Sequence, residues 1–189
     1  MAAPPKFPRP KKPPIQPPLP GQEVEPTVSL RYERLIGRIV VNWSKLEACM
    51  EDLIWSLLKL EIEKGRVITA RMDAVNKIRM LRELGVQELP EPMFHRLSPA
   101  LDHIDVLRED RNFVVHGTWG RTKPSFMHVC LSLRPQALER DQIMTETFPE
   151  MRMYEILNGI ELRKQELIEL MSELHALPGR SVPKHHEGL

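Results

Sequence analysis

The fold of this chain is decided by residues 27–60, which read TVSLRYERLIGRIVVNWSKLEACMEDLIWSLLKL. Large apolar side chains recur there at intervals of three and four residues, the period of one face of an α-helix. The apolar residues at this spacing are Tyr32, Leu35, Ile36, Ile39, Trp43, Leu46, Met50, Leu53, Ile54 and Leu57. The stretch therefore predicts one long amphipathic helix.

Two later stretches follow the same period and predict two more helices. One runs from about Lys64 to Leu84, and Gly85 is expected to end it as the C′ residue. The other covers about residues 150–177 and ends before Pro178 and Gly179. The side chains expected to face inward are Ile68, Met72, Val75, Ile78 and Leu81 in the first, and Tyr154, Leu157, Ile160, Leu167, Met171 and Leu174 in the second.

A further helix lies between these two. We expect it to begin with Ser98 as N-cap and Pro99 at the first helical position, or to begin earlier with a kink. It is predicted to end at His116, because Gly117 supplies the left-handed residue that closes many helices.

After this helix the period changes from that of a helix to that of a strand. Met127, Val129, Leu131 and Leu133 alternate with smaller or polar residues, which predicts a half-buried strand, and residues 118–121 are a candidate partner strand. The fold class is therefore all-α: a four-helix-type bundle with a short β-hairpin or strand insertion before the last helix.

The N-terminal segment differs in composition. Residues 1–26 hold ten of the 18 prolines, which excludes regular helix and sheet and predicts a disordered, partly polyproline II arm. It suits a PxxP ligand, a basic tether to an anionic partner or a plain linker. A helical domain over 27–178 and a disordered tail over 179–189 complete the predicted organisation.

Length and composition bound the class of protein. The chain has 189 residues, 41% of them hydrophobic, and no apolar run near the roughly 18 residues of a membrane span. The start has no apolar core of a secretory signal, so we expect a soluble cytoplasmic protein without membrane contact. Cys49 and Cys130 fit neither a disulfide framework nor a zinc-ligand spacing, and no metal or cofactor is expected.

The charge is nearly balanced overall but uneven locally. Of 27 basic and 26 acidic residues, the arm holds four and two, which leaves 23 and 24 in the rest. Such a body has no general attraction for nucleic acid. Between Arg111 and Arg134, however, Arg121 and Lys123 add to the positive charge, and no acidic residue occurs. A focused basic patch is predicted there.

Residues 111–117, RNFVVHG, carry the most informative arginine. On a helix Arg111 falls about 20° from Ile104, within the apolar stripe that Leu97, Leu101 and Leu107 mark. A buried charge without partners is costly, so Arg111 is expected to meet an acid, a phosphate or a wet cleft between protein surfaces.

Arg111 and His116 together suit phosphodiester chemistry. A guanidinium clamps a phosphate through two hydrogen bonds, and an imidazole takes or gives a proton near neutrality. Five residues on an ideal helix separate them by about 140° and about 7.5 Å, a gap that fraying at Gly117 and the long arginine side chain can close. The negative end of the helix dipole favours the imidazolium form of His116 and biases it toward a general acid.

Arg111, four intervening residues and His116, with Asn112 directly after the arginine, resemble the signature of the HEPN superfamily. The long first helix with Trp43 to Glu47, followed by a second helix and the motif at the end of the third, agrees over about residues 28–177. The resemblance implies an all-α fold and a metal-independent endoribonuclease, often a toxin or defence protein, whose homodimer joins two motifs in one cleft.

The same resemblance implies residue roles. Arg111 would hold the scissile phosphate, His116 would move protons, and Asn112 would orient the motif by hydrogen bonding. Glu47, at the edge of the first helix's stripe, either anchors the arginine or histidine or is a solvated glutamate. The RNA 2′-hydroxyl would attack its phosphate and leave a 2′,3′-cyclic phosphate. An antitoxin or regulatory protein would be a further partner.

Two other interpretations remain open. The chain is alternatively a non-catalytic helical dimer that binds a partner or nucleotide, with Arg111 as an interface residue. Or His116 caps a helix and Arg111 pairs with Glu47 in one protomer. Trp119 suits base stacking or plain packing, and Arg121 and Lys123 are candidate RNA contacts. The sequence holds no Gly-rich phosphate loop and no GxSxG elbow.

Overall fold

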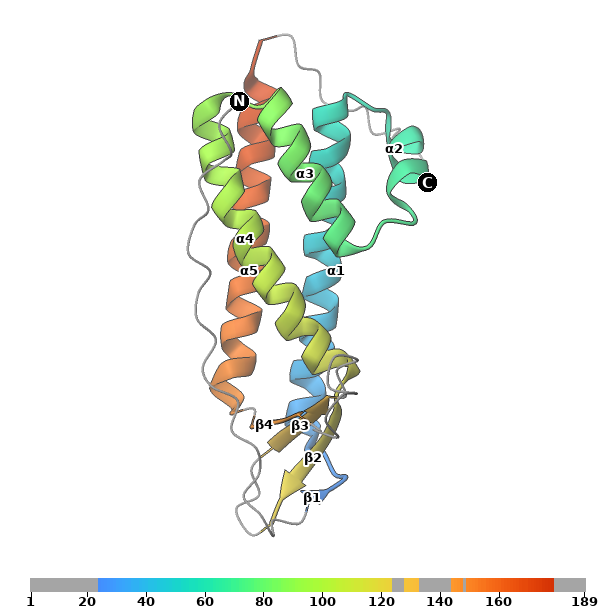
Figure 1. Ribbon diagram of the computed structural model, residues 1–189, viewed down its shortest axis with the longest axis vertical. Coiled ribbons are helices and arrows are strands. Elements are labelled where there is room, and N and C mark those ends of the chain that lie inside the picture. Colours follow the sequence, from blue (N-terminus) through green and yellow to red (C-terminus); the bar gives the residue numbers. More distant parts are fainter. Residues whose placement is uncertain (1–23, 124–127, 133–143, 148, 179–189) are drawn as a thin grey trace. The chain divides into compact units, whose positions relative to one another are not determined.

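Helices and one small sheet account for the regular structure. The computed structural model describes residues 24–123, 128–132, 144–147 and 149–178. The all-α fold class with a β insertion before the last helix is confirmed. In chain order the elements are β1 (Val24–Glu25), α1 (Leu30–Leu58), α2 (Ile62–Thr69), α3 (Ala74–Glu88), α4 (Glu91–His116), β2 (Thr118–Thr122), β3 (His128–Ser132), β4 (Met144–Thr147) and α5 (Glu150–Ala176) (Figure 1).

The chain divides into two compact units. The helical unit consists of the described residues of Asn42–Arg108 and Gly159–Leu189, and the motif unit of those of Met1–Val41 and Glu109–Asn158. Because α1, α4 and α5 each contribute residues to both, no linker separates the units along the chain. Most of the predicted proline-rich arm, up to residue 23, and the tail from residue 179 lie outside the described residues.

In the helical unit, segments of α1, α3, α4 and α5 lie side by side around an apolar core (Figure 1). Polar contacts join neighbouring helices at the margins of this core. Arg96 of α4 binds Glu173 of α5 at 2.7 Å, and Ser56 Oγ of α1 lies 3.0 Å from His175 Nε2 of α5. The fully buried side chains include Trp43, Leu46, Met50, Leu53, Leu81, Leu97, Leu101, Ile104, Ile160, Leu167 and Leu174.

The predicted second helix is wrong as a single element, because α2 and α3 replace it. Asp73 starts α3 as its N-cap and accepts a hydrogen bond of 2.8 Å from the Asn76 amide. A capping side chain of this kind favours a new helix start over continuation. Ile68 and Val75, expected to face inward, are 42% and 39% exposed, and the buried stripe of α3 runs instead through Ala74, Lys77, Ile78, Leu81 and Gly85.

Gly85 does not end this helix, which was also predicted wrongly. It lies inside α3, which continues to Glu88. A Cβ atom at Gly85 would come within 3.1 Å of both the Leu97 and Phe94 side chains of α4. The glycine is therefore explained by the close approach of two helices and not by a chain reversal.

The start of α4 corresponds to the earlier of the two predicted starts. The helix begins at Glu91 and passes through Pro99, and the amides of Met93 and Phe94 both donate to the Pro90 carbonyl at 3.0 Å. Ser98 is buried inside the helix and is not its N-cap. The predicted end at His116 is confirmed, and the Gly117 amide donates to the Phe113 carbonyl at 3.0 Å.

The motif unit contains an antiparallel sheet in the strand order β1-β2-β3-β4. The predicted pairing of residues 118–121 with the strand at 128–132 is confirmed by the register Trp119↔Cys130 and Arg121↔His128. Strand β4 was not predicted. The exclusion of sheet from residues 1–26 is wrong at the end of that stretch, because β1 pairs there with β2. The buried side chains of this unit include Tyr32, Leu35, Ile39, Phe113, Val114, Val129, Cys130, Met153, Ile156 and Leu157.

Candidate functional site

The last turn of α4 is fixed to the sheet by its own backbone carbonyls. Phe113 and Val114 are buried at 5% and 0% exposure. The Trp119 indole N–H donates to the Val114 carbonyl at 2.8 Å, and the Cys130 thiol donates to the Phe113 carbonyl at 3.4 Å. Carbonyls at a helix end need such partners. Side chains of β2 and β3 therefore anchor the turn that carries the motif.

Arg111 is half-buried within this turn and only partly satisfied. Its Nη1 donates to the Asn112 Oδ1 at 3.0 Å. Its Nε is buried and has no hydrogen-bond partner among the described residues. The contact places the guanidinium beside the Asn112 amide, as an orienting role for Asn112 requires. A buried N–H without an acceptor is costly, so the arginine is not explained by packing alone.

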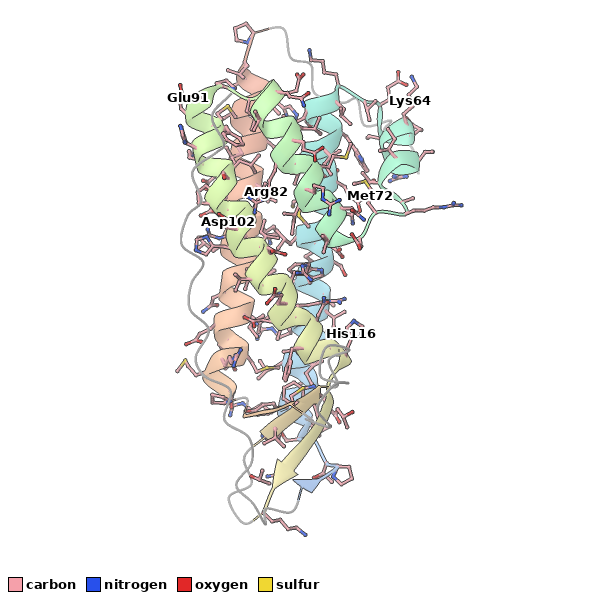
Figure 2. The ribbon with its side chains drawn as sticks, in the orientation of Figure 1. Lys64, Met72, Arg82, Glu91, Asp102 and His116 are labelled. Atoms are coloured by element: carbon pink, nitrogen blue, oxygen red, sulfur yellow. The ribbon has the colours of Figure 1, made fainter. Side chains whose placement is uncertain are left out.

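His116 is exposed as the final residue of α4, where Figure 2 labels it. No hydrogen bond or ion pair holds its imidazole in the described part of the chain. The helix is regular through His116, so the angular separation of about 140° from Arg111 is the helical one. Fraying of the last turn does not bring the two side chains together.

Glu47 has a different partner from those predicted for it. In the helical unit its carboxylate lies 3.8 Å from the Lys77 Nζ, and Glu51 lies closer, at 2.6 Å. Lys77 is only 6% exposed, and a buried ammonium requires carboxylates of this kind. Support of Arg111 or His116 by Glu47 stays a prediction, because the ion-pair partner of Glu47 is Lys77.

The three tentative RNA contacts lie on or next to β2. Trp119 is half-buried, and its ring packs edge-on against Tyr32 with centroids 6.0 Å apart. With its indole N–H already donated, the residue fits the packing alternative better than base stacking. Arg121 is half-buried on the same face of β2, and Lys123 is exposed just after the strand.

Sequence reasoning missed the contact between His128 and α1. The imidazole stacks on the Tyr32 ring with centroids 3.5 Å apart and accepts a hydrogen bond of 3.4 Å from the Ser29 amide. Burial lowers the pKa of His128, Arg121 lowers it further, and Glu150 opposes the shift. Strand alternation marked His128 as polar, but nothing local indicates a partner 99 residues away.

The described residues offer no metal centre and no disulfide as an alternative site. No group of three or more His, Cys, Asp or Glu side chains suited to a metal ion occurs among the described residues. Cys49 and Cys130 are both free thiols. Within the described stretches, no helix combines the length and the apolar character needed to cross a bilayer. No family model, curated protein or solved structure matches this chain.

Proposed function

We propose that this chain is a metal-independent endoribonuclease of the HEPN kind that acts through Arg111 and His116. The observation that carries the proposal is the guanidinium of Arg111. The side chain is half-buried, its Nη1 is held by Asn112, and no acidic residue forms an ion pair with it among the described residues. A phosphate oxygen is the acceptor that a guanidinium fork fits best.

The residues divide the chemistry of RNA cleavage between them. The ribose O2′ forms a bond to phosphorus, its proton passes to a base, and the bond from phosphorus to O5′ breaks. Arg111 binds the non-bridging oxygens and stabilises their developing charge. His116, exposed and without a partner among the described residues, donates the proton that the O5′ leaving group needs. Asn112 positions the guanidinium.

This assignment names no residue of the same chain as the base that accepts the O2′ proton. His128 is the other described histidine of the motif unit. Its imidazole is already engaged, because it stacks on the Tyr32 ring and its Nε2 accepts a hydrogen bond from the Ser29 amide. We propose that a second copy supplies the base, so that two motifs form one site across a two-fold axis.

Cleavage of RNA in EDTA tests the proposal. We expect the purified chain to cut single-stranded RNA into products with 2′,3′-cyclic phosphate ends and to leave DNA intact. His116→Ala should abolish cleavage, and Arg111→Lys, which keeps the charge but loses the fork, should reduce it strongly. His95→Ala, on an exposed histidine of the same helix, is the matched control and should cut normally. Equal cutting by His116→Ala and His95→Ala contradicts the proposal.

A second candidate function is a non-catalytic adaptor that dimerises through the same residues. The same half-buried guanidinium, which has no ion pair among the described residues, favours it, because a carbonyl or carboxylate of a partner accepts from an arginine as a phosphate does. In that case the wild-type chain does not cut RNA, and Arg111→Ala shifts the sedimentation of a dimer to that of a monomer.

A defence or toxin role, with an antitoxin or regulatory partner, extends the nuclease proposal. Induced expression should then arrest growth, and His116→Ala should relieve the arrest. An arrest that persists in His116→Ala separates toxicity from the proposed chemistry.

A further inference from the structure

The first half of α1 carries two arginines that the fold does not use. Arg34 and Arg38 are exposed, and neither has a hydrogen bond or ion pair in the part of the chain that the structure describes. Arg31, three residues before Arg34, is different: it forms an ion pair with Glu150 and hydrogen bonds to Tyr154. The first of the three arginines is thus held in an ion pair, and the next two have no ion-pair partner among the described residues.

The two arginines share one open face of α1. Their spacing of four residues puts them on the same side of the helix, and Val41 and Gly37 lie on that side as well. Val41 is 55% exposed, and a Cβ atom built at Gly37 meets nothing within 4 Å. We call Arg34, Gly37, Arg38 and Val41 the arginine face.

Helix stability does not account for this face. Like charges four residues apart repel, and glycine within a helix is less favourable than alanine. Neither arginine forms an ion pair among the described residues, and the Glu150 carboxylate is engaged by Arg31. Both costs would be recovered by a polyanion that lies along the arginines and approaches the backbone at Gly37.

We propose that the arginine face binds the sugar-phosphate backbone of the RNA strand that is cut at Arg111 and His116. This inference rests on the proposed function and adds the path of the substrate. The face and the motif belong to the same compact unit. RNA fits better than an acidic peptide, because phosphates repeat along a strand at a spacing that two arginines one helical turn apart can follow, and no base contact is required.

RNA binding by the full chain carrying His116→Ala tests this, because binding is then measured without cutting. Labelled single-stranded RNA is titrated at several salt concentrations with Arg34→Ala/Arg38→Ala added. We expect about tenfold weaker binding at low salt and a slope of log affinity against log salt smaller by about 1.4, or 0.7 for each lost phosphate contact. Arg66→Ala/Arg71→Ala, which removes two exposed arginines from the helical unit, is the matched control.

The proposal is overturned if both double variants bind RNA with the same affinity. It is also overturned if Arg34→Ala/Arg38→Ala changes only the sedimentation of the protein, because the arginine face would then bind protein. Cleavage by the otherwise wild-type chain separates the two proposals. We expect Arg34→Ala/Arg38→Ala to raise KM and leave kcat unchanged. If the wild-type chain binds RNA through these arginines but does not cut it, only the nuclease proposal is contradicted. If the chain cuts RNA and the cleavage does not depend on these arginines, only the proposed substrate path is contradicted.

Discussion

Lys77 in the helical unit and Arg111 in the motif unit occupy the same kind of position. Each is a cation on the apolar stripe of a long helix, and the two have opposite surroundings. Lys77 is met by two carboxylates, with Glu51 at 2.6 Å. Arg111 is met by one neutral amide, and its Nε stays unpaired among the described residues. If the proposed function holds, the contrast teaches that burial of a cation does not distinguish a structural residue from a functional one, and that the presence or absence of a counter-ion does.

The same substitution at both positions tests this contrast, and the larger effect is expected at Arg111. Arg111→Met should reduce RNA cleavage by about 10²–10³-fold, the usual loss when a group that stabilises transition-state charge is removed. The free energy of unfolding should be unchanged or slightly higher, because the variant removes a buried N–H without an acceptor. Cleavage assays and urea unfolding measure the two quantities. A large loss of stability would make Arg111 a structural residue like Lys77.

Lys77→Met should give the reverse pattern. Removing the ammonium leaves two carboxylates facing each other at 26% and 28% exposure, so we expect a loss of about 2 kcal/mol, below the 3–5 typical of fully buried pairs. Cleavage should be unaffected at temperatures where the variant is folded.

Adding Glu51→Leu to Lys77→Met is the control for this reading. Replacing both partners by apolar groups should restore much of the stability, because the uncompensated carboxylate is then gone. No recovery would mean that Lys77 stabilises the unit by packing its side chain and not by its charge.

The helices could be predicted wherever their signals are local. The apolar repeat of α1 and the stop at Gly117 lie within the segments they define, so these boundaries were predicted closely. The prediction that Gly85 ends a helix was wrong, because a glycine that ends a helix and a glycine that lets a neighbouring helix approach look alike in sequence. Pro99 left two helix starts open, because proline fits the first turn of a helix and also occurs within a helix at the cost of one hydrogen bond, and the structure has the earlier start.

The candidate site follows the same division. The stripe position of Arg111 is a local signal, and Lys77 gives the same signal on the stripe of Ala74, Ile78 and Leu81, where it was overlooked. What the sequence lacks is the identity of the partners. Lys77 meets the carboxylate of Glu51, and His128 meets the ring of Tyr32. In both pairs the partner belongs to another element, so only the fold brings the two residues together.

Two helical glycines, one in each unit, extend the comparison to the space around the backbone. A Cβ atom at Gly65 of α2 would lie 2.5 Å from the Trp55 indole, so Gly65→Ala should cost about 1–3 kcal/mol by overpacking. Gly37 of α1 meets nothing within 4 Å, so Gly37→Ala should stabilise the protein by about 0.5–1 kcal/mol through helix propensity. Thermal unfolding of both variants measures this, and destabilisation by Gly37→Ala would mean that the arginine face is covered.

The smallest expected effect is a pH dependence confined to the motif unit. The folded protein lowers the pKa of His128 below its ordinary value of about 6.5, because burial and Arg121 disfavour the charged ring more than Glu150 favours it. Folding therefore favours the neutral imidazole. The stabilisation is fully present above the unfolded pKa and is lost as pH falls through the folded pKa.

His128→Phe isolates this contribution, because phenylalanine keeps the stacked ring against Tyr32 but does not titrate. Urea unfolding from about pH 8 to pH 5 should show wild type losing stability relative to this variant as the pH falls. All other ionisable residues are the same in both proteins, so their contributions cancel in the difference. A difference that stays constant with pH would show that protonation of His128 does not loosen the contact between β3 and α1. The protonation state of His128 would then have no effect on the stability of the unit that carries Arg111.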